Sequence, residues 1–168
     1  MGLASTLLIS GLSPVAARTR LPRRAVDLTY ASLYVGMEQS TVASPSLLVS
    51  TSLATIEKNF PRGSSTASSP PPRDTGPQLY LGLTLARYSC LTDHLAGITY
   101  GPGARLTLSV EKQRLLPGRA CSQLIGPLMY QVVALPLSQF PAGLRLKVTL
   151  DRPTPLLSDR TYFRLPTS

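Results

Sequence analysis

Apolar and polar residues alternate along several segments of the chain, most clearly over residues 104–112. After the turn formed by Gly101, Pro102 and Gly103, Arg105 is expected to point outward, whereas Leu106, Leu108 and Val110 point inward. A period of two is typical of a β-strand with one buried face and one face in water. The same alternation occurs over residues 78–88 and over residues 143–151, where Arg145 and Lys147 take outward positions. These segments predict three two-faced strands.

Other segments predict the remaining elements. Residues 26–37 favour a further strand because they are rich in tyrosine and β-branched residues. Residues 128–137 form a nearly continuous apolar run, which predicts a strand buried on both faces and ended by Pro136. Between Ser44, a suitable N-cap, and Pro61 we expect a helix, with a strand as the competing interpretation. Residues 90–95 are expected to form only a short segment.

Together these elements predict an α+β fold that is mainly β, a single domain with about five strands and one main helix. We expect a basic flexible arm over residues 1–25 and a globular β-rich domain over residues 26–151. Residues 61–77 are rich in serine and proline and predict a disordered loop within that domain. Residues 152–168 predict a basic tail.

The charge balance narrows the choice of partner. The chain carries a net charge of +9, and arginine far outnumbers lysine. Guanidinium groups bind oxyanions in a bidentate way, so this excess favours contact with phosphate, in nucleic acid or on an anionic membrane. The candidate binding residues are the arm arginines and the outward cations of the strands: Arg18, Arg20, Arg23, Arg24, Arg105, Arg145 and Lys147.

No motif in the sequence indicates catalysis. The chain lacks glycine-rich phosphate loops and a GxSxG nucleophile turn, and its carboxylates are scattered. Cys90 and Cys121 are isolated, and His94 has no cluster of metal ligands nearby in sequence, so we expect it at the surface or in a loop. We therefore expect a protein that is not an enzyme and that has no metal site and no cofactor.

The first twenty-six residues contain no acidic side chain and leave four interpretations open. Gly2 followed by Thr6 fits the short pattern for N-myristoylation. The apolar stretch from Leu3 to Leu12 resembles a signal-peptide core, and the serine- and arginine-rich composition is that of an organelle transit peptide. The fourth interpretation is a plain basic arm, which we favour. The apolar stretch is too short to span a bilayer.

Two segments resemble the matrix proteins of rhabdoviruses. These are the Y-x-x-x-x-x-L-T-L-S-V pattern from Tyr100 to Val110 and the sequence LMYQVV from Leu128 to Val133, within a similar order of elements over residues 26–150. The resemblance implies a basic viral structural protein of the virion that self-associates into homo-oligomers and bridges the nucleocapsid, or its RNA, and an anionic membrane. It also implies a location in the virion and in the host cytoplasm or at the inner face of the membrane.

Three alternatives remain open. The basic arm and the segment around Phe140, which ends at Arg152-Pro153-Thr154, are similar to the jelly-roll coat proteins of small plant RNA viruses. Such a protein would package RNA in an icosahedral shell. The composition of the first segment also fits an organelle-targeted accessory protein. Finally, the skewed composition fits a spurious reading frame without a function.

Overall fold

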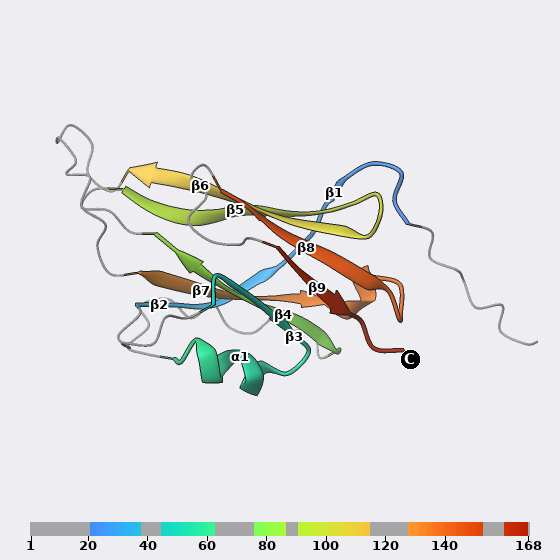
Figure 1. Ribbon diagram of the computed structural model, residues 1–168, viewed down its shortest axis with the longest axis horizontal. Helices are drawn as coiled ribbons and strands as arrows, with labels where there is room; N and C mark the ends of the chain where they lie inside the picture. Colours follow the sequence, from blue (N-terminus) through green and yellow to red (C-terminus); the bar gives the residue numbers. More distant parts are fainter. Residues whose placement is uncertain are drawn as a thin grey trace, which may run out of the picture.

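The computed structural model describes residues 21–37, 45–62, 76–86, 91–114, 128–152 and 160–167. Within these residues the chain forms two β-sheets and one α-helix, stacked in three layers (Figure 1). The expected class, a mainly β domain with a single helix, is confirmed. The described residues contain nine strands, and several of these are short or lie in segments where the sequence predicts another structure.

The five-stranded sheet has the strand order β1-β5-β6-β8-β9. All neighbouring pairs in it are antiparallel except β6 and β8, which run parallel. Its strands are β1 (Val26–Asp27), β5 (Leu91–Gly101), β6 (Arg105–Arg114), β8 (Arg145–Asp151) and β9 (Arg160–Arg164).

The four-stranded sheet has the order β2-β7-β4-β3 and is antiparallel throughout. Its strands are β2 (Ala31–Met37), β3 (Leu47–Ser50), β4 (Gln78–Leu85) and β7 (Met129–Pro136). The helix α1 (Leu53–Asn59) covers its outer face, and a short 3-10 turn, η1 (Leu137–Gln139), follows β7.

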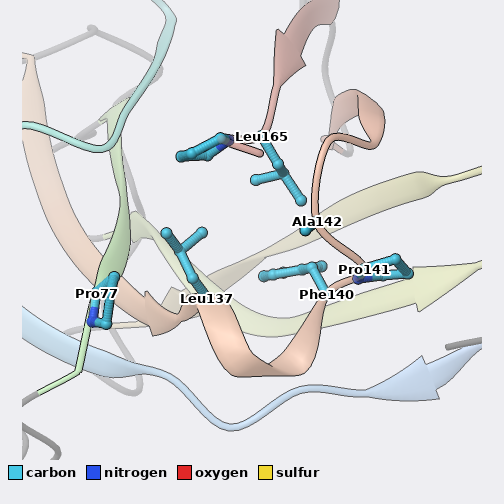
Figure 2. Close-up of a pocket in the computed structure, with 7 residues that line it drawn as sticks. Pro77, Leu137, Phe140, Pro141, Ala142 and Leu165 are labelled. Atoms are coloured by element: carbon cyan, nitrogen blue, oxygen red, sulfur yellow. The ribbon is translucent and has the colours of Figure 1, made fainter. Parts of the chain in front are cut away.

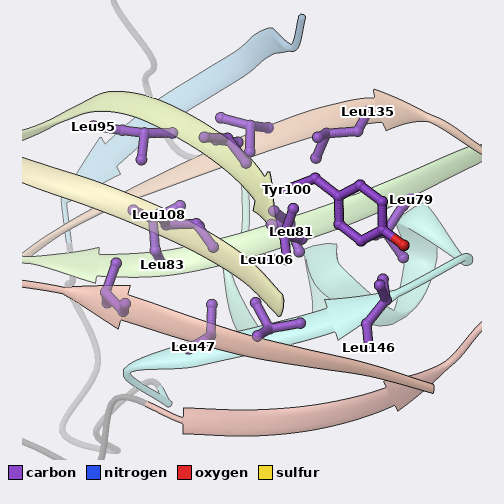
Figure 3. Packing of buried hydrophobic residues seen from close by; sticks show 14 of the residues in the cluster. Leu47, Leu79, Leu81, Leu83, Leu95, Tyr100, Leu106, Leu108, Leu135 and Leu146 are labelled. Atoms are coloured by element: carbon purple, nitrogen blue, oxygen red, sulfur yellow. The ribbon is translucent and has the colours of Figure 1, made fainter. Parts of the chain in front are cut away.

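The main core lies between the two sheets (Figure 3). Alternate leucines of β4, such as Leu81 and Leu83, pack against inward residues of the opposite sheet, such as Leu106 and Leu108. All four side chains are fully buried. The alternation read from the sequence therefore assigns the inward residues of β4, β6 and β8 correctly. The water-facing side expected for β4 is wrong, because Gly82 and Thr84 on its other face are buried too.

A second, smaller core lies between the four-stranded sheet and α1. Ile56 and Phe60 of the helix segment pack on Tyr34 of β2 and on Tyr130 and Val132 of β7. Strand β7 is consequently buried on both faces, and it ends at Pro136, as its apolar sequence predicts. This sheet is the middle layer of the molecule.

Glycines in the middle sheet make room for the aromatic rings of the second core. A Cβ atom added at Gly82 would lie 2.3 Å from the ring of Phe60, and one added at Gly36 would lie 2.4 Å from Tyr130. Both distances are far below van der Waals contact, so any larger side chain at either position would displace the ring beside it.

Three sequence predictions need correction. The helix does not begin after Ser44, because Leu47–Ser50 pairs with β4 as strand β3, and the helix starts at Leu53. Residues 26–37 form two strands, β1 and β2, which belong to different sheets. The segment around residues 90–95 is the beginning of β5, a strand of eleven residues that is held by ladder pairing with β6 along its length.

The fourth correction concerns the chain after residue 151. The sequence predicts a basic tail over residues 152–168, yet Arg160–Arg164 forms strand β9 and pairs with β8. This segment therefore belongs to the folded domain. The disordered loop predicted at residues 61–77 lies mostly outside the described residues, as do residues 1–20 of the predicted arm.

A candidate polyanion-binding face

The outer face of the five-stranded sheet is not covered by another layer in the described part of the chain. Three neighbouring strands, β6, β8 and β9, present cations there. We use the name basic face for the outward side chains Arg105, Arg145, Lys147, Arg160, Tyr162 and Arg164. The four arginines and the tyrosine are exposed, and Lys147 is half-buried.

The strand register brings these residues together. Arg105 pairs with Lys147 across β6 and β8, and Lys147 pairs with Tyr162 across β8 and β9. Two residues before Lys147 in β8, Arg145 pairs with Arg164. Neighbouring strands lie about 4.8 Å apart and alternate residues along a strand about 6.6 Å apart, so the cations follow one another at intervals of about 5 to 7 Å.

The parallel pairing of β6 and β8 gathers the charge at one end of the sheet. Both strands begin with cations, Arg105 in β6 and Arg145 in β8, and the parallel register sets Arg105 opposite Lys147, the next outward residue after Arg145. The antiparallel strand β9 ends at the same edge with Arg164. The nearest outward acid on these strands, Asp151, lies at the other end of β8, opposite Ser109 and diagonal to Arg160, which pairs with Thr149.

The basic face is not neutralised by neighbouring acids. None of its five cations forms an ion pair with another described residue. The ion pair found in the described part of the chain, Arg62 with Glu57, lies beyond the other sheet. Arg145 and Arg164 moreover stand directly opposite each other, an arrangement of like charges that destabilises a sheet. An anionic ligand bound between these two arginines would reduce the repulsion between their positive charges, so this surface is suited to bind anions.

Tyr162 stands in the middle of the cations. The guanidinium carbon of Arg145 lies 5.0 Å from the centre of its ring, which is a cation–π contact. The tyrosine is nevertheless 54% exposed. The contact with Arg145 holds the ring over the face and leaves much of its surface open to solvent.

A row of threonines borders the cations on the same face. Thr99 of β5 pairs with Thr107 of β6, and Thr107 pairs with Thr149 of β8. All three are partly exposed. Hydroxyl groups both donate and accept hydrogen bonds, so this row offers neutral polar contacts beside the charged ones.

The structure unites only some of the residues predicted from the sequence. Arg105, Arg145 and Lys147 lie together on the basic face. Arg23 and Arg24 are exposed and lie just before β1. They are close to the Arg105 end of the basic face, because Ala25, the next residue, lies beside Gly101, the β5 partner of Arg105. A Cβ atom added at Gly101 would be 3.7 Å from the Cβ atom of Ala25. Arg18, Arg20 and Gly2 lie outside the described residues.

Half of the basic face does not follow from the sequence predictions. Arg160, Tyr162 and Arg164 lie in the predicted tail, although they alternate with the inward residues Thr161 and Phe163. That alternation is the sequence signal for β9. It is weak because the segment is short and flanked by prolines, both of which indicate a loop.

The described residues offer little for catalysis. No group of three or more histidine, cysteine, aspartate or glutamate side chains within them could hold a metal ion. His94, expected at the surface or in a loop, lies in strand β5 and is half-buried. Asp93 beside it is buried and accepts a hydrogen bond from the backbone of Ala86, a structural contact.

One pocket lies at the end of the sandwich where η1 meets the residues after β9 (Figure 2). Its volume is about 250 Å³. No titratable side chain lines it, so it holds no acid, base or nucleophile for a reaction. The lining residues are Pro77, Leu137, Phe140, Pro141, Ala142, Leu165 and Pro166.

Comparisons of the chain with protein-family models, with curated proteins and with solved structures find no match. Among the described residues, no helix has the length and apolar character needed to cross a bilayer.

Proposed function

We propose that this protein is a viral structural protein of the matrix type, which self-associates and bridges a nucleocapsid and an anionic membrane through basic surfaces. It acts by binding and assembly and does not catalyse a reaction. The observation that carries the proposal is the basic face, on which five cations lie together without an ion pair in the described part of the chain. The natural counter-charge for such a surface is a row of phosphates.

Two basic surfaces suit a bridging role better than one. In this proposal the basic face contacts the RNA of the nucleocapsid, and the arm with Arg18, Arg20, Arg23 and Arg24 contacts the membrane. Each cation near an anionic membrane contributes on the order of 1 kcal/mol, so the arm gives about 4 kcal/mol. That corresponds to dissociation in the millimolar range, so membrane binding requires many copies acting together. Self-association is therefore part of the proposal.

The alternatives receive less support. A jelly-roll coat protein is built from antiparallel strands, whereas β6 and β8 run parallel. An organelle-targeted protein depends on a signal in residues 1–20, which the structure does not describe. Two packed cores in the described residues favour a folded protein over a spurious frame.

Flotation of the full chain with vesicles and RNA tests the proposal. We expect binding to anionic but not to neutral vesicles, binding to RNA, and large assemblies when both are present, all weakened by salt. Lys147→Gln should lower RNA binding. The matched control is Lys58→Gln, which removes an exposed lysine from α1, on the other side of the molecule. Closed particles of uniform size with RNA alone would favour the coat protein instead, and binding to neither partner would refute both.

A further inference from the structure

The basic face combines cations with an exposed aromatic ring, and these two features suit different chemical groups of one ligand. Its cations match phosphate groups, whereas the exposed ring of Tyr162 adds an apolar aromatic surface that the cations do not provide. An aromatic ring on an open sheet surface is a platform on which an unpaired base stacks. Both features lie within one cross-strand row, since Tyr162 pairs with Lys147 and Lys147 pairs with Arg105.

We propose that the basic face binds single-stranded nucleic acid, with one base stacked on Tyr162 and the flanking phosphates held by the surrounding arginines and Lys147. This inference rests on the proposed function and specifies its ligand. It makes the face selective for an unpaired strand over a duplex, in which the bases stack on each other and cannot reach a protein ring.

The position of Arg145 supports this assignment. Its guanidinium lies 5.0 Å from the ring centre of Tyr162, so the ring is already oriented before a ligand arrives. A base on the free part of the ring extends this stack, while the charge of Arg145 remains available to the neighbouring phosphate. Arg164, opposite Arg145, places a second cation beside the same site.

The spacing of the remaining groups also fits an extended strand. Arg105 lies two strands away from Tyr162 in the same row, a distance of about 10 Å. Along β9, Arg160 and Arg164 lie on the two sides of Tyr162, each about 6.6 Å away. A single strand that crosses the face thus meets a cation on either side of the stacked base. The threonine row next to it offers hydroxyls to sugars and base edges.

A membrane surface is the competing ligand, because an exposed tyrosine among cations also occurs at lipid headgroups. The two ligands make different demands on the ring. Stacking needs a flat aromatic surface, and phenylalanine provides it as well as tyrosine does. Insertion among lipids needs apolar bulk, which leucine provides too. Replacing the tyrosine with each of these residues therefore separates the two ligands.

The test compares three probes: a single-stranded RNA oligonucleotide, the corresponding RNA duplex, and vesicles with anionic lipid. Tyr162→Leu in the full chain should weaken single-strand binding about 5- to 150-fold, which is the expected loss of one stacked base. Duplex and vesicle binding should change less than about twofold, and Tyr162→Phe should retain single-strand affinity. Arg160→Gln should weaken single-strand and duplex binding by similar factors, as a phosphate contact does.

Equal losses on single strand and duplex, no loss with Tyr162→Leu, or a loss on vesicles alone would each overturn the inference. If Arg160→Gln weakens RNA binding while Tyr162→Leu does not, the proposed function survives and only the stacking site is refuted. If the wild-type protein binds none of the three probes, the proposed function itself fails. Photo-crosslinking of the wild-type protein to a single strand that carries 5-bromouridine is a second measurement, and it should mark Tyr162.

Discussion

Tyr34 donates its hydroxyl to the carbonyl oxygen of Phe60 at 2.7 Å, which ties β2 to the end of α1. Tyr130, from the neighbouring strand β7, donates in the same way to the next carbonyl, that of Pro61. Both carbonyls belong to the two residues directly after Asn59, so the two tyrosines hold the end of α1 against the sheet. The contact holds the outer layer of the molecule in place.

Because the Tyr34 hydroxyl is buried in this contact, we expect the free energy of unfolding to fall at alkaline pH. Burial raises the pKa of Tyr34 to about 12, and the negative charge of Glu57 adds to the effect. In the unfolded chain the phenol titrates near pH 10. The stabilisation is therefore complete below pH 10 and is lost as the pH rises toward 12, a total of roughly 2 to 3 kcal/mol.

Urea unfolding of the wild type and of Tyr34→Phe at pH 9 and pH 11 measures this dependence. The advantage of the wild type over the variant should shrink by about 1 kcal/mol between these two pH values, because phenylalanine does not titrate. Tyr30 and Tyr100, whose pKa values burial also raises, titrate in both proteins and cancel in the difference. A difference that stays constant with pH would contradict the assigned environment of Tyr34.

The glycine beneath Phe60 provides a second test. A methyl group at Gly82 would lie 2.3 Å from the Phe60 ring, which is fully buried and has no room to move away. We expect Gly82→Ala to lower the free energy of unfolding by about 1 to 3 kcal/mol. Gly97→Ala is the matched control, because nothing lies within 4 Å of its added Cβ. Equal effects of the two substitutions in thermal denaturation would refute this packing.

The repulsion within the basic face predicts an unusual gain in stability. Arg164→Gln removes one of two arginines that stand opposite each other, so it should stabilise the protein by a few tenths of a kcal/mol at low salt. The gain should vanish near 1 M salt, where charges on the surface are screened. Lys58→Gln should bring no gain. If Arg164→Gln destabilises the protein at low salt, the face carries counter-charges that this account does not include.

The arm and the basic face should act separately. Replacing Arg18, Arg20, Arg23 and Arg24 with glutamine should weaken binding to anionic vesicles by up to about 1 kcal/mol for each arginine. It should leave the preference for single-stranded over duplex RNA unchanged, since Tyr162 remains. Vesicle flotation and RNA titration on the same protein check both statements. A lost strand preference would show that the arm, and not the sheet, recognises RNA.

The sequence predicts those parts of the fold in which local pattern and tertiary structure agree. Strands β6 and β8 alternate cleanly because each has one buried face, and β7 is continuously apolar because both its faces are buried. The sequence predicts a helix where β3 lies, because Ser44 and Pro45 are typical of the first residues of a helix. The pairing of β3 with β4 overrides that local preference. Long-range pairing decides such short segments.

The candidate site shows the same limit. The outward positions of Arg105, Arg145 and Lys147 follow from alternation alone. Their proximity does not, because it depends on the parallel register of β6 and β8, which are separated by a long stretch of chain. An antiparallel register would place Arg105 near Asp151 and would neutralise the face. Tyr162 became part of the site only through the pairing of β9.

The most direct test of the central claim is the salt dependence of binding to single-stranded RNA. Log–log plots of the binding constant against salt should fall with a slope near −0.7 for each phosphate neutralised, hence about −3 for four or five contacts. Replacing Arg105, Lys147 and Arg164 with glutamine should reduce this slope by about two, whereas Lys58→Gln should not change it. A slope that the triple substitution leaves unchanged would show that the basic face does not bind RNA.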